Sequence, residues 1–236
     1  MNKPEDKHRP IRSFAIRSGR MTDGQRQGLA KHLEQWGLTR NDQLIDLDQA
    51  FGNTNPQVLE IGFGMGDSLA QMAKAKPEWN FIGVEVHLPG IGRLLSLVSE
   101  LELSNVRVFH DDAVQVLQHC IAEHSLQRVN IYFPDPWHKT KHHKRRLIQP
   151  AFLELLHSRL APNGLLHIAT DWQPYAEHVL NTMQDQIFFD NVAADNTFVS
   201  AQDYDRPETK FERRGQRLGH DVWDMVFRSR PAQRSI

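Results

Sequence analysis

The organisation of this chain follows from ten consecutive residues, Val58-Leu59-Glu60-Ile61-Gly62-Phe63-Gly64-Met65-Gly66-Asp67. An apolar, β-branched run ends in an acid, glycine follows at every second position, and the next residues have a helical pattern. This order is typical of a buried parallel strand, a tight turn and a helix. Glycine lets the backbone take positive φ and lets a ligand approach bare amides. The stretch therefore predicts the turn at which an open α/β sheet binds a nucleotide-like ligand.

The spacing of the glycines indicates which ligand the turn binds. A dinucleotide fingerprint, G-x-G-x-x-G, counted from Gly62, would place its third glycine where the sequence has Asp67. Glu60 adds a carboxylate at the strand end, which disfavours a diphosphate and suits a ligand with a cationic centre. S-adenosyl-L-methionine carries a sulfonium and an ammonium, so we expect Glu60, Gly62, Gly64 and Gly66 to bind it rather than NAD. A purely structural glycine turn is the alternative.

Length and composition are those of an ordinary globular protein. The chain has 236 residues, of which 39% are hydrophobic and 24% charged, which fits one domain with an appended arm. No apolar run approaches the length of a membrane span, and residues 1–7 do not resemble a signal peptide. The single cysteine, Cys120, excludes an internal disulfide. We therefore expect a cytoplasmic protein without a membrane partner.

The charge is unevenly distributed along the chain. The formal net charge is −1, yet residues 1–40 contain nine Lys and Arg against four acids. A second basic run occupies residues 139–146. Local basic patches on a nearly neutral protein indicate a polyanion bound at one face.

The remaining pattern predicts an α/β fold in two parts, a basic N-terminal arm with a first helix over residues 1–40 and an α/β domain over residues 41–236. The first expected helix is capped by Thr22 or Asp23 and runs to about Trp36. The other expected helices are 68–76, 91–102, 113–124, 147–160 and 174–185, and the expected strands are 58–61, 81–86, 106–109, 129–133 and 165–170. Residues 188–192 or 198–199 are expected to pair with 222–227 as an antiparallel edge, with loops at 41–56 and 200–221.

Acids follow the first three predicted strands. Glu85 lies 25 residues after Glu60, close to the spacing of the acid that binds ribose hydroxyls. Asp111 and Asp112 follow the third strand, where a carboxylate can accept from the adenine amine. Ligands lie outside the carboxyl ends of the strands in such sheets. A helix N-cap or a solvated loop charge is the alternative for each acid.

Two further acids are each next to an aromatic residue. Asp135 lies between two prolines, which fix the backbone on both sides, and Trp137 follows it. Asp171 and Trp172 follow the next strand. An indole offers a face on which a base can stack, so the two pairs predict a base pocket; a plain proline-rich loop is the alternative.

The basic run is adjacent to that pocket. Its five Lys and Arg residues fit successive phosphates of a nucleic acid. A zinc site from His138, His142 and His143 is disfavoured, because no Cys or acid nearby completes a tetrahedron. Later in the chain, residues 206–215 have no secondary-structure pattern and fit either a lid over the base or a charged surface loop.

Several segments together resemble the bacterial tRNA (guanine-N7)-methyltransferase family. They are Ile61-Gly62-Phe63-Gly64-Met65-Gly66, Phe133-Pro134-Asp135-Pro136-Trp137-His138-Lys139, Lys144-Arg145-Arg146, Ala169-Thr170-Asp171-Trp172 and Thr209-Lys210-Phe211-Glu212. The resemblance implies a Rossmann-like class I methyltransferase, with a mostly parallel seven-stranded sheet, helices on both faces and an antiparallel edge hairpin. It also implies S-adenosyl-L-methionine as methyl donor and the variable-loop guanosine, position 46, of tRNA as substrate.

The resemblance also implies roles for individual residues. Asp135 would be the active-site residue and would line the cofactor site with Glu60, Glu85 and Asp112. The residues expected to contact substrate are Lys139, Asp171, Thr209, Lys210, Phe211 and Glu212. The residues expected to contact RNA are Lys141, His142, His143, Lys144, Arg145 and Arg146.

The other functions considered are a methyltransferase for another RNA or a small base, and a non-catalytic RNA-binding protein with a methyltransferase fold. The basic run disfavours a small-molecule enzyme. The sequence does not give the oligomeric state; a monomer is expected, with a homodimer as the alternative.

Overall fold

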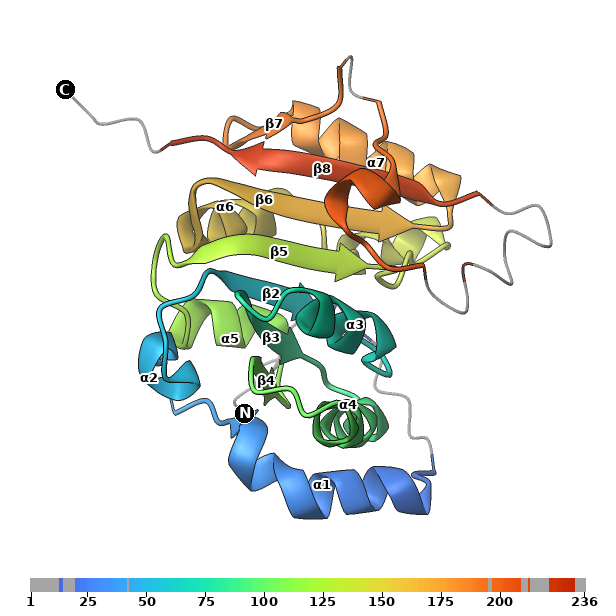
Figure 1. Cartoon of the computed structure of the whole chain (residues 1–236). Coiled ribbons are helices and arrows are strands. Elements are labelled where there is room, and N and C mark those ends of the chain that lie inside the picture. The colour runs from blue at the N-terminus through green and yellow to red at the C-terminus, as the bar shows by residue number, and fades with distance from the viewer. Residues whose placement is uncertain are drawn as a thin grey trace, which may run out of the picture.

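The computed structural model describes residues 13–14, 20–41, 43–194, 197–208, 212 and 221–231. The main feature is one sheet of eight strands, in the order β1-β4-β3-β2-β5-β6-β8-β7 (Figure 1). The strands are β1 (Gly37–Leu38), β2 (Gln57–Ile61), β3 (Asn80–Val84), β4 (Val106–Phe109), β5 (Leu126–Tyr132), β6 (Leu160–Thr170), β7 (Phe189–Asn191) and β8 (Trp223–Ser229).

The first six strands are parallel, and β8 is antiparallel to both of its neighbours, β6 and β7. Every residue of β2 and β3 is buried, as expected for central parallel strands covered on both faces. The predicted α/β class, the parallel sheet and the antiparallel edge are confirmed.

The predicted number of seven strands is wrong, because Gly37 and Leu38 form an eighth. Gly37 ends the preceding helix with an extended backbone, at φ −77° and ψ 138°. The chain then pairs with Val108 and Phe109 of β4. A pair of two residues carries no alternation of apolar and polar side chains, so the sequence pattern does not contain it.

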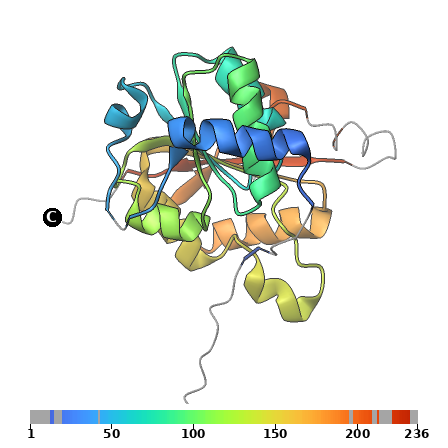
Figure 2. The ribbon, with the colours of Figure 1, turned by 90° about the horizontal axis from the view of Figure 1, so that it is seen from below.

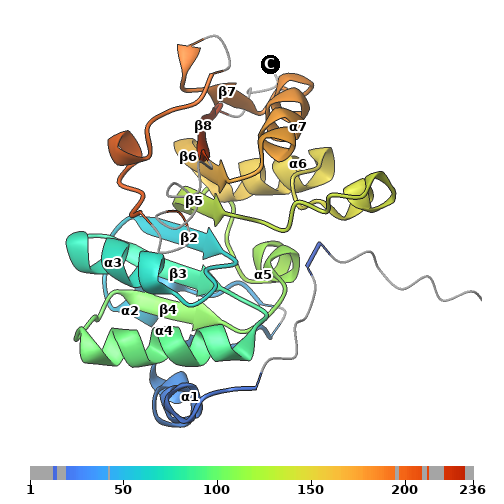
Figure 3. The same ribbon diagram turned by 90° about the vertical axis from the view of Figure 1, so that its right-hand side faces the viewer.

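Helices cover both faces of the sheet. They are α1 (Asp23–Trp36), α2 (Leu47–Phe51), α3 (Asp67–Ala75), α4 (Leu88–Glu100), α5 (Ala113–His119), α6 (Pro150–Arg159) and α7 (Gln173–Gln184), with short 3-10 helices η1 (Thr140–Arg145) and η3 (Ala201–Tyr204). Buried side chains of α2, α5, α6 and α7 share one core cluster, and those of α3 and α4 share the other. Helix α1 lies across the outside of α4 (Figure 2). On the α3 side, η3 rather than a helix of full length covers β6 and β8 (Figure 3).

Several element boundaries differ from the prediction. The loop predicted at 41–56 contains α2, whose N-cap Asp46 accepts from the Gln49 amide and whose C-cap Gly52 has φ 73°. Helix α4 begins before Pro89, because proline is favoured in a first helical turn. Helix α5 ends at His119 and α6 begins at Pro150. The first helix, by contrast, starts as predicted, with Thr22 and Gln25 forming a capping box.

Candidate active site

The glycine turn contains three residues with positive φ. Gly62, Gly64 and Gly66 have φ of 71°, 60° and 79°, a region in which other residues are strained. A Cβ on Gly62 or Gly64 would meet no atom within 4 Å, whereas one on Gly66 would lie 2.7 Å from Leu94 Cβ. The first two glycines therefore leave open space beside the backbone, and the third lets α3 pack on α4.

Glu85, which follows β3, accepts a hydrogen bond from this turn. Its Oε2 accepts from the Gly64 amide at 3.0 Å, and its Oε1 accepts from the amides of Val86 and His87 at 2.7 and 3.0 Å. A Cβ on Gly90, in the first turn of α4, would lie 2.0 Å from the Gly64 carbonyl oxygen. The turn is thus clamped between the Glu85 carboxylate and the start of α4.

Asp112 follows β4 and caps α5. One carboxylate oxygen accepts from the Val114 amide at 2.8 Å, so the N-cap role weighed from the sequence is present. Its other oxygen accepts no hydrogen bond within the described part of the chain and is left for a ligand. The neighbouring Asp111 accepts from Arg40 Nε at 2.8 Å, which holds the loop after β4 against the chain that follows β1.

Glu60 is buried on the α3 face of the sheet, with 3% of its surface exposed. Among the described residues its Oε2 has no hydrogen-bond partner. Burial raises the pKa of the carboxyl to about 8, and the positive charge of Arg128 opposes this shift. A buried carboxylate oxygen without a donor fits a ligand that brings one, such as an ammonium.

Asp135 lies in a loop in which two residues have positive φ. Phe133 and Trp137 have φ of 52° and 48°, a sparsely populated region for such bulky side chains. The Phe133 amide donates to the Ala169 carbonyl oxygen at 2.8 Å, which joins the start of the loop to β6. Asp135, partly buried, is therefore carried by a segment whose backbone is fixed at both ends.

The two predicted indoles are both in contact with cations or imidazoles. The Arg145 guanidinium lies 3.7 Å from the centre of the Trp137 ring, and Trp137 Nε1 donates to the Ser13 carbonyl oxygen at 3.0 Å. The His138 ring meets Trp172 edge-on at 4.3 Å. One face of Trp137 is thus covered, and base stacking on either indole stays a prediction.

The basic run forms η1 and its flanks, and most of it faces outward. Lys139, Lys141 and Lys144 are exposed, and His142, His143 and Arg145 are partly exposed. Arg146 is buried. Its Nε donates to the Pro136 carbonyl oxygen at 3.0 Å, so this guanidinium supports the Asp135 loop, and its contact with RNA stays a prediction.

Acidic and basic residues line one cleft. Its volume is about 840 Å³, and its lining includes Asp111, Asp112, Lys144 and Arg145. Ser13 and Phe14 of the N-terminal arm also contribute to the wall. Of the predicted cofactor acids, Asp112 lines this cleft together with Lys144, Arg145 and Arg146 of the predicted RNA-binding run. Glu60, Glu85 and Asp135 are not among its lining residues.

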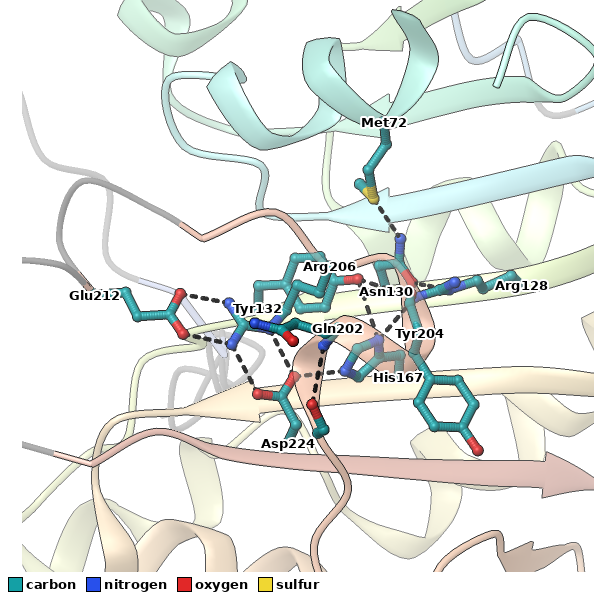
Figure 4. Close-up of polar contacts among 11 residues, drawn as sticks. Met72, Arg128, Asn130, Tyr132, His167, Gln202, Tyr204, Arg206, Glu212 and Asp224 are labelled. Carbon is teal, nitrogen blue, oxygen red and sulfur yellow. Dashed lines mark hydrogen bonds and ion pairs between the residues drawn. The ribbon is translucent and has the colours of Figure 1, made fainter. Parts of the chain in front are cut away.

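The predicted substrate residues of the late segment are only partly placed. Thr209, Lys210 and Phe211 lie outside the described residues, and Asp171 is exposed at the end of β6. Glu212 is buried and forms a bidentate ion pair with Arg206, at 2.6 and 2.7 Å (Figure 4).

Arg206 also pairs with Asp224 on β8. The sequence placed Arg206 only within the late loop and gave Asp224 no role. The available signal was a charged residue inside the apolar strand pattern of 222–227.

The described ranges of the chain meet the requirements of neither a metal site nor a membrane span. No group of three or more His, Cys, Asp or Glu side chains in them is arranged to hold a metal ion. No helix in them has both the length and the apolar character needed to cross a membrane.

Comparison with solved structures gives the class of protein. The chain superposes on the 16S rRNA methyltransferase KamB with a TM-score of 0.58 and 12% identity, over 80% of this chain and 95% of that one. A 16S rRNA (adenine(1408)-N(1))-methyltransferase from Catenulisporales acidiphilia, solved with its cosubstrate S-adenosyl-L-methionine, gives a TM-score of 0.53 and 15% identity, over 81% and 95%. The fold is that of a class I methyltransferase.

Sequence comparison gives the family. A family model described as "Putative methyltransferase" matches residues 54–225. The tRNA (guanine-N(7)-)-methyltransferase of Ectopseudomonas mendocina (strain ymp) is 56% identical over 219 residues, covering 93% of this chain and 92% of the relative. That of Alcanivorax borkumensis is 51% identical over 222 residues, covering 94% and 92%. The chain belongs to the tRNA (guanine-N(7)-)-methyltransferase family. The roles of individual residues stay predictions.

Proposed function

We propose that this protein transfers a methyl group from S-adenosyl-L-methionine to N7 of a guanosine in tRNA, and that this guanosine is position 46 of the variable loop. The observation that carries the proposal is one cleft lined by Asp112 and by Lys144 and Arg145. It combines a carboxylate suited to the cofactor with cations suited to a polyanion. Membership of the family supports the choice of tRNA and of guanine N7.

The residues around the glycine turn fit the cofactor. Glu60 Oε2, which has no hydrogen-bond partner in the described part of the chain, suits its ammonium, and the open space at Gly62 and Gly64 admits the cofactor close to the backbone. Glu85 would accept from the ribose hydroxyls, and the free oxygen of Asp112 from the adenine amine. When bound, S-adenosyl-L-methionine supplies an electrophilic methyl group on a sulfonium.

Guanine N7 has a lone pair and no proton to lose, so the reaction needs alignment and electrostatic stabilisation rather than a general base. Asp135 would accept hydrogen bonds from the guanine N1–H and amino group. The purine becomes cationic as it is methylated, so these bonds strengthen during the reaction. The fixed backbones of Phe133 and Trp137 support this role, because they limit the movement of the Asp135 carboxylate.

Binding of tRNA would depend on the exposed cations of η1 and its flanks. Lys139, Lys141 and Lys144 have solvent-facing side chains suited to phosphate oxygens, and Asp171 would contact the base beside Asp135. The protein would act in the cytoplasm, as a monomer, with residues 1–40 as an arm and 41–236 as the methyltransferase domain.

The test is methylation of an unmodified tRNA transcript with labelled S-adenosyl-L-methionine, followed by chemical cleavage at N7-methylguanosine. We expect cleavage at position 46 and loss of label incorporation when that guanosine is replaced by adenosine. Label at another atom or in another RNA only would contradict the proposed substrate, and binding of tRNA without label would indicate a non-catalytic protein.

A further inference from the structure

Arg206 lies between two carboxylates that come from different parts of the chain. Its Nη1 and Nη2 donate to Glu212 at 2.6 and 2.7 Å, and its Nε and Nη2 donate to Asp224 at 2.6 and 2.7 Å. All three side chains are at least 95% buried. A planar guanidinium that pairs in a bidentate manner with two carboxylates fixes their relative position and orientation.

Asp224 also belongs to a chain of hydrogen bonds that begins on β5 and β6 (Figure 4). Arg128 Nη2 donates to His167 Nδ1 at 2.7 Å, so Nε2 carries the imidazole proton and donates to Asp224 Oδ1 at 2.6 Å. Desolvation lowers the pKa of His167, which favours this neutral form. Arg128 also donates to the Tyr204 carbonyl oxygen at 2.7 Å. The chain of contacts therefore joins β5, β6, β8 and η3.

The position of Arg206 connects Glu212 to the edge where the two acid–aromatic pairs lie. The Arg206 guanidinium is 5.7 Å from the ring of Phe133, the residue that begins the Asp135 loop. Asp224 is opposite Ala169 in the register of β6 and β8, and Asp171 follows Ala169 by two residues, directly after the end of β6. Glu212 is thus anchored beside the ends of β5 and β6, where Asp135 and Asp171 are carried.

The stability that buried ion pairs contribute is a weak reason for the pairing of Arg206 with two carboxylates. Buried ion pairs lose hydration that their mutual attraction only partly recovers, and well-packed apolar side chains often replace them without loss. What apolar side chains cannot do is hold a carboxylate in one orientation. The fork of Arg206 does so for Glu212, a residue expected to contact the substrate.

We propose that Arg206 is a positioning residue for methyl transfer, which holds the Glu212 carboxylate beside the ends of β5 and β6 by bridging it to Asp224. The inference rests on the proposed function, and it adds a residue that acts on the reaction through Glu212.

The test is the rate of methyl transfer in a single turnover, with protein in excess over tRNA and saturating S-adenosyl-L-methionine. Arg206→Lys keeps the charge but cannot form a bidentate pair with each carboxylate, and we expect the rate to fall about 10- to 100-fold through misalignment. Cofactor affinity should change less than about 2-fold. Arg230→Lys is the matched control, because Arg230 pairs with Asp190 on the surface and the rate should stay unchanged.

A double-mutant cycle separates positioning from general support of the fold. If Arg206 acts through Glu212, Arg206→Lys should lower the rate strongly in wild-type protein and hardly at all in Glu212→Gln. Equal losses in both backgrounds would overturn the proposal, as would a normal rate in Arg206→Lys. If Arg206→Lys fails to fold, Asp224→Asn replaces it in the same cycle with the same expectation and the same refuting result.

Wild-type protein in the same assay distinguishes this inference from the proposed function. Absence of N7 methylation by wild-type protein would reject both. Normal wild-type methylation with a normal rate in the folded variant would reject only the positioning role.

Discussion

The burial of Glu60 makes a quantitative prediction about cofactor binding and pH. The pKa of this carboxyl in the free protein is raised to about 8 by desolvation. A cationic ligand favours the ionised carboxylate, so binding should release the proton. The affinity of wild-type protein should therefore increase with pH through a contribution that Glu60→Gln lacks.

The size of this contribution follows from the ionised fraction of the free protein. With a pKa of about 8, that fraction rises from about 3% at pH 6.5 to about 76% at pH 8.5. If Glu60 is ionised throughout in the complex, the ratio of wild-type to Glu60→Gln affinity should increase about 25-fold over this range. At pH 7 about 0.9 proton should leave on binding.

Titration calorimetry with S-adenosyl-L-methionine measures both quantities. The ratio of the two affinities removes the titration of the ligand's own amino group, whose unperturbed pKa is close to 8. Buffers of different ionisation enthalpy then report the released proton directly. A ratio that stays constant between pH 6.5 and 8.5, with no dependence of the enthalpy on buffer, would refute the argument.

The same shift acts on stability with a defined sign. The pKa of Glu60 in the folded protein lies above its usual value of 4.5, so the folded state binds more protons between these two values. The contribution of Glu60 to stability is therefore fully present below about pH 4.5 and is lost as the pH rises to about 8. Urea unfolding of the free protein should show this loss in the wild type and not in Glu60→Gln.

Three further predictions concern the cleft. Asp135→Ala should lower the single-turnover rate of methylation at least about 100-fold while cofactor affinity by calorimetry changes little, and a near-normal rate would remove its assigned role. Replacing Lys141 and Lys144 together by Gln should weaken tRNA binding and reduce its salt slope by about 2; filter binding at several salt concentrations measures this, and an unchanged slope would contradict phosphate contacts. Gly90→Ala would place a Cβ 2.0 Å from the Gly64 carbonyl oxygen and should lower cofactor affinity more than it lowers the melting temperature; the reverse order of effects would contradict the clamp on the turn.

The parts of the structure that the sequence predicts are those with a local physical cause. The β-branched run before Gly62 becomes a buried strand, and the glycine spacing matches three backbones of positive φ. Thr22 caps the first helix because its side chain and that of Gln25 satisfy free amides within one turn. Such features depend on neighbours a few residues apart, so pattern and turn chemistry are enough.

The parts that the sequence does not predict depend on residues far apart in the chain. Arg146 belongs to a basic run that favours a solvated surface, yet tertiary packing buries it under the Asp135 loop. The pairing of Arg206 with Asp224 joins two segments through the fold of β8 beside β6. No spacing within one element encodes these contacts.

In the proposed reaction, guanine N7 of a tRNA attacks the sulfonium-bound methyl group. A tRNA with 7-deazaguanosine at position 46, in which a C–H group replaces the lone pair at N7, tests this reaction. We predict tRNA binding within about 2-fold of that of the unmodified transcript and no transfer of label. Undiminished transfer of label to the deaza tRNA would contradict the proposed reaction.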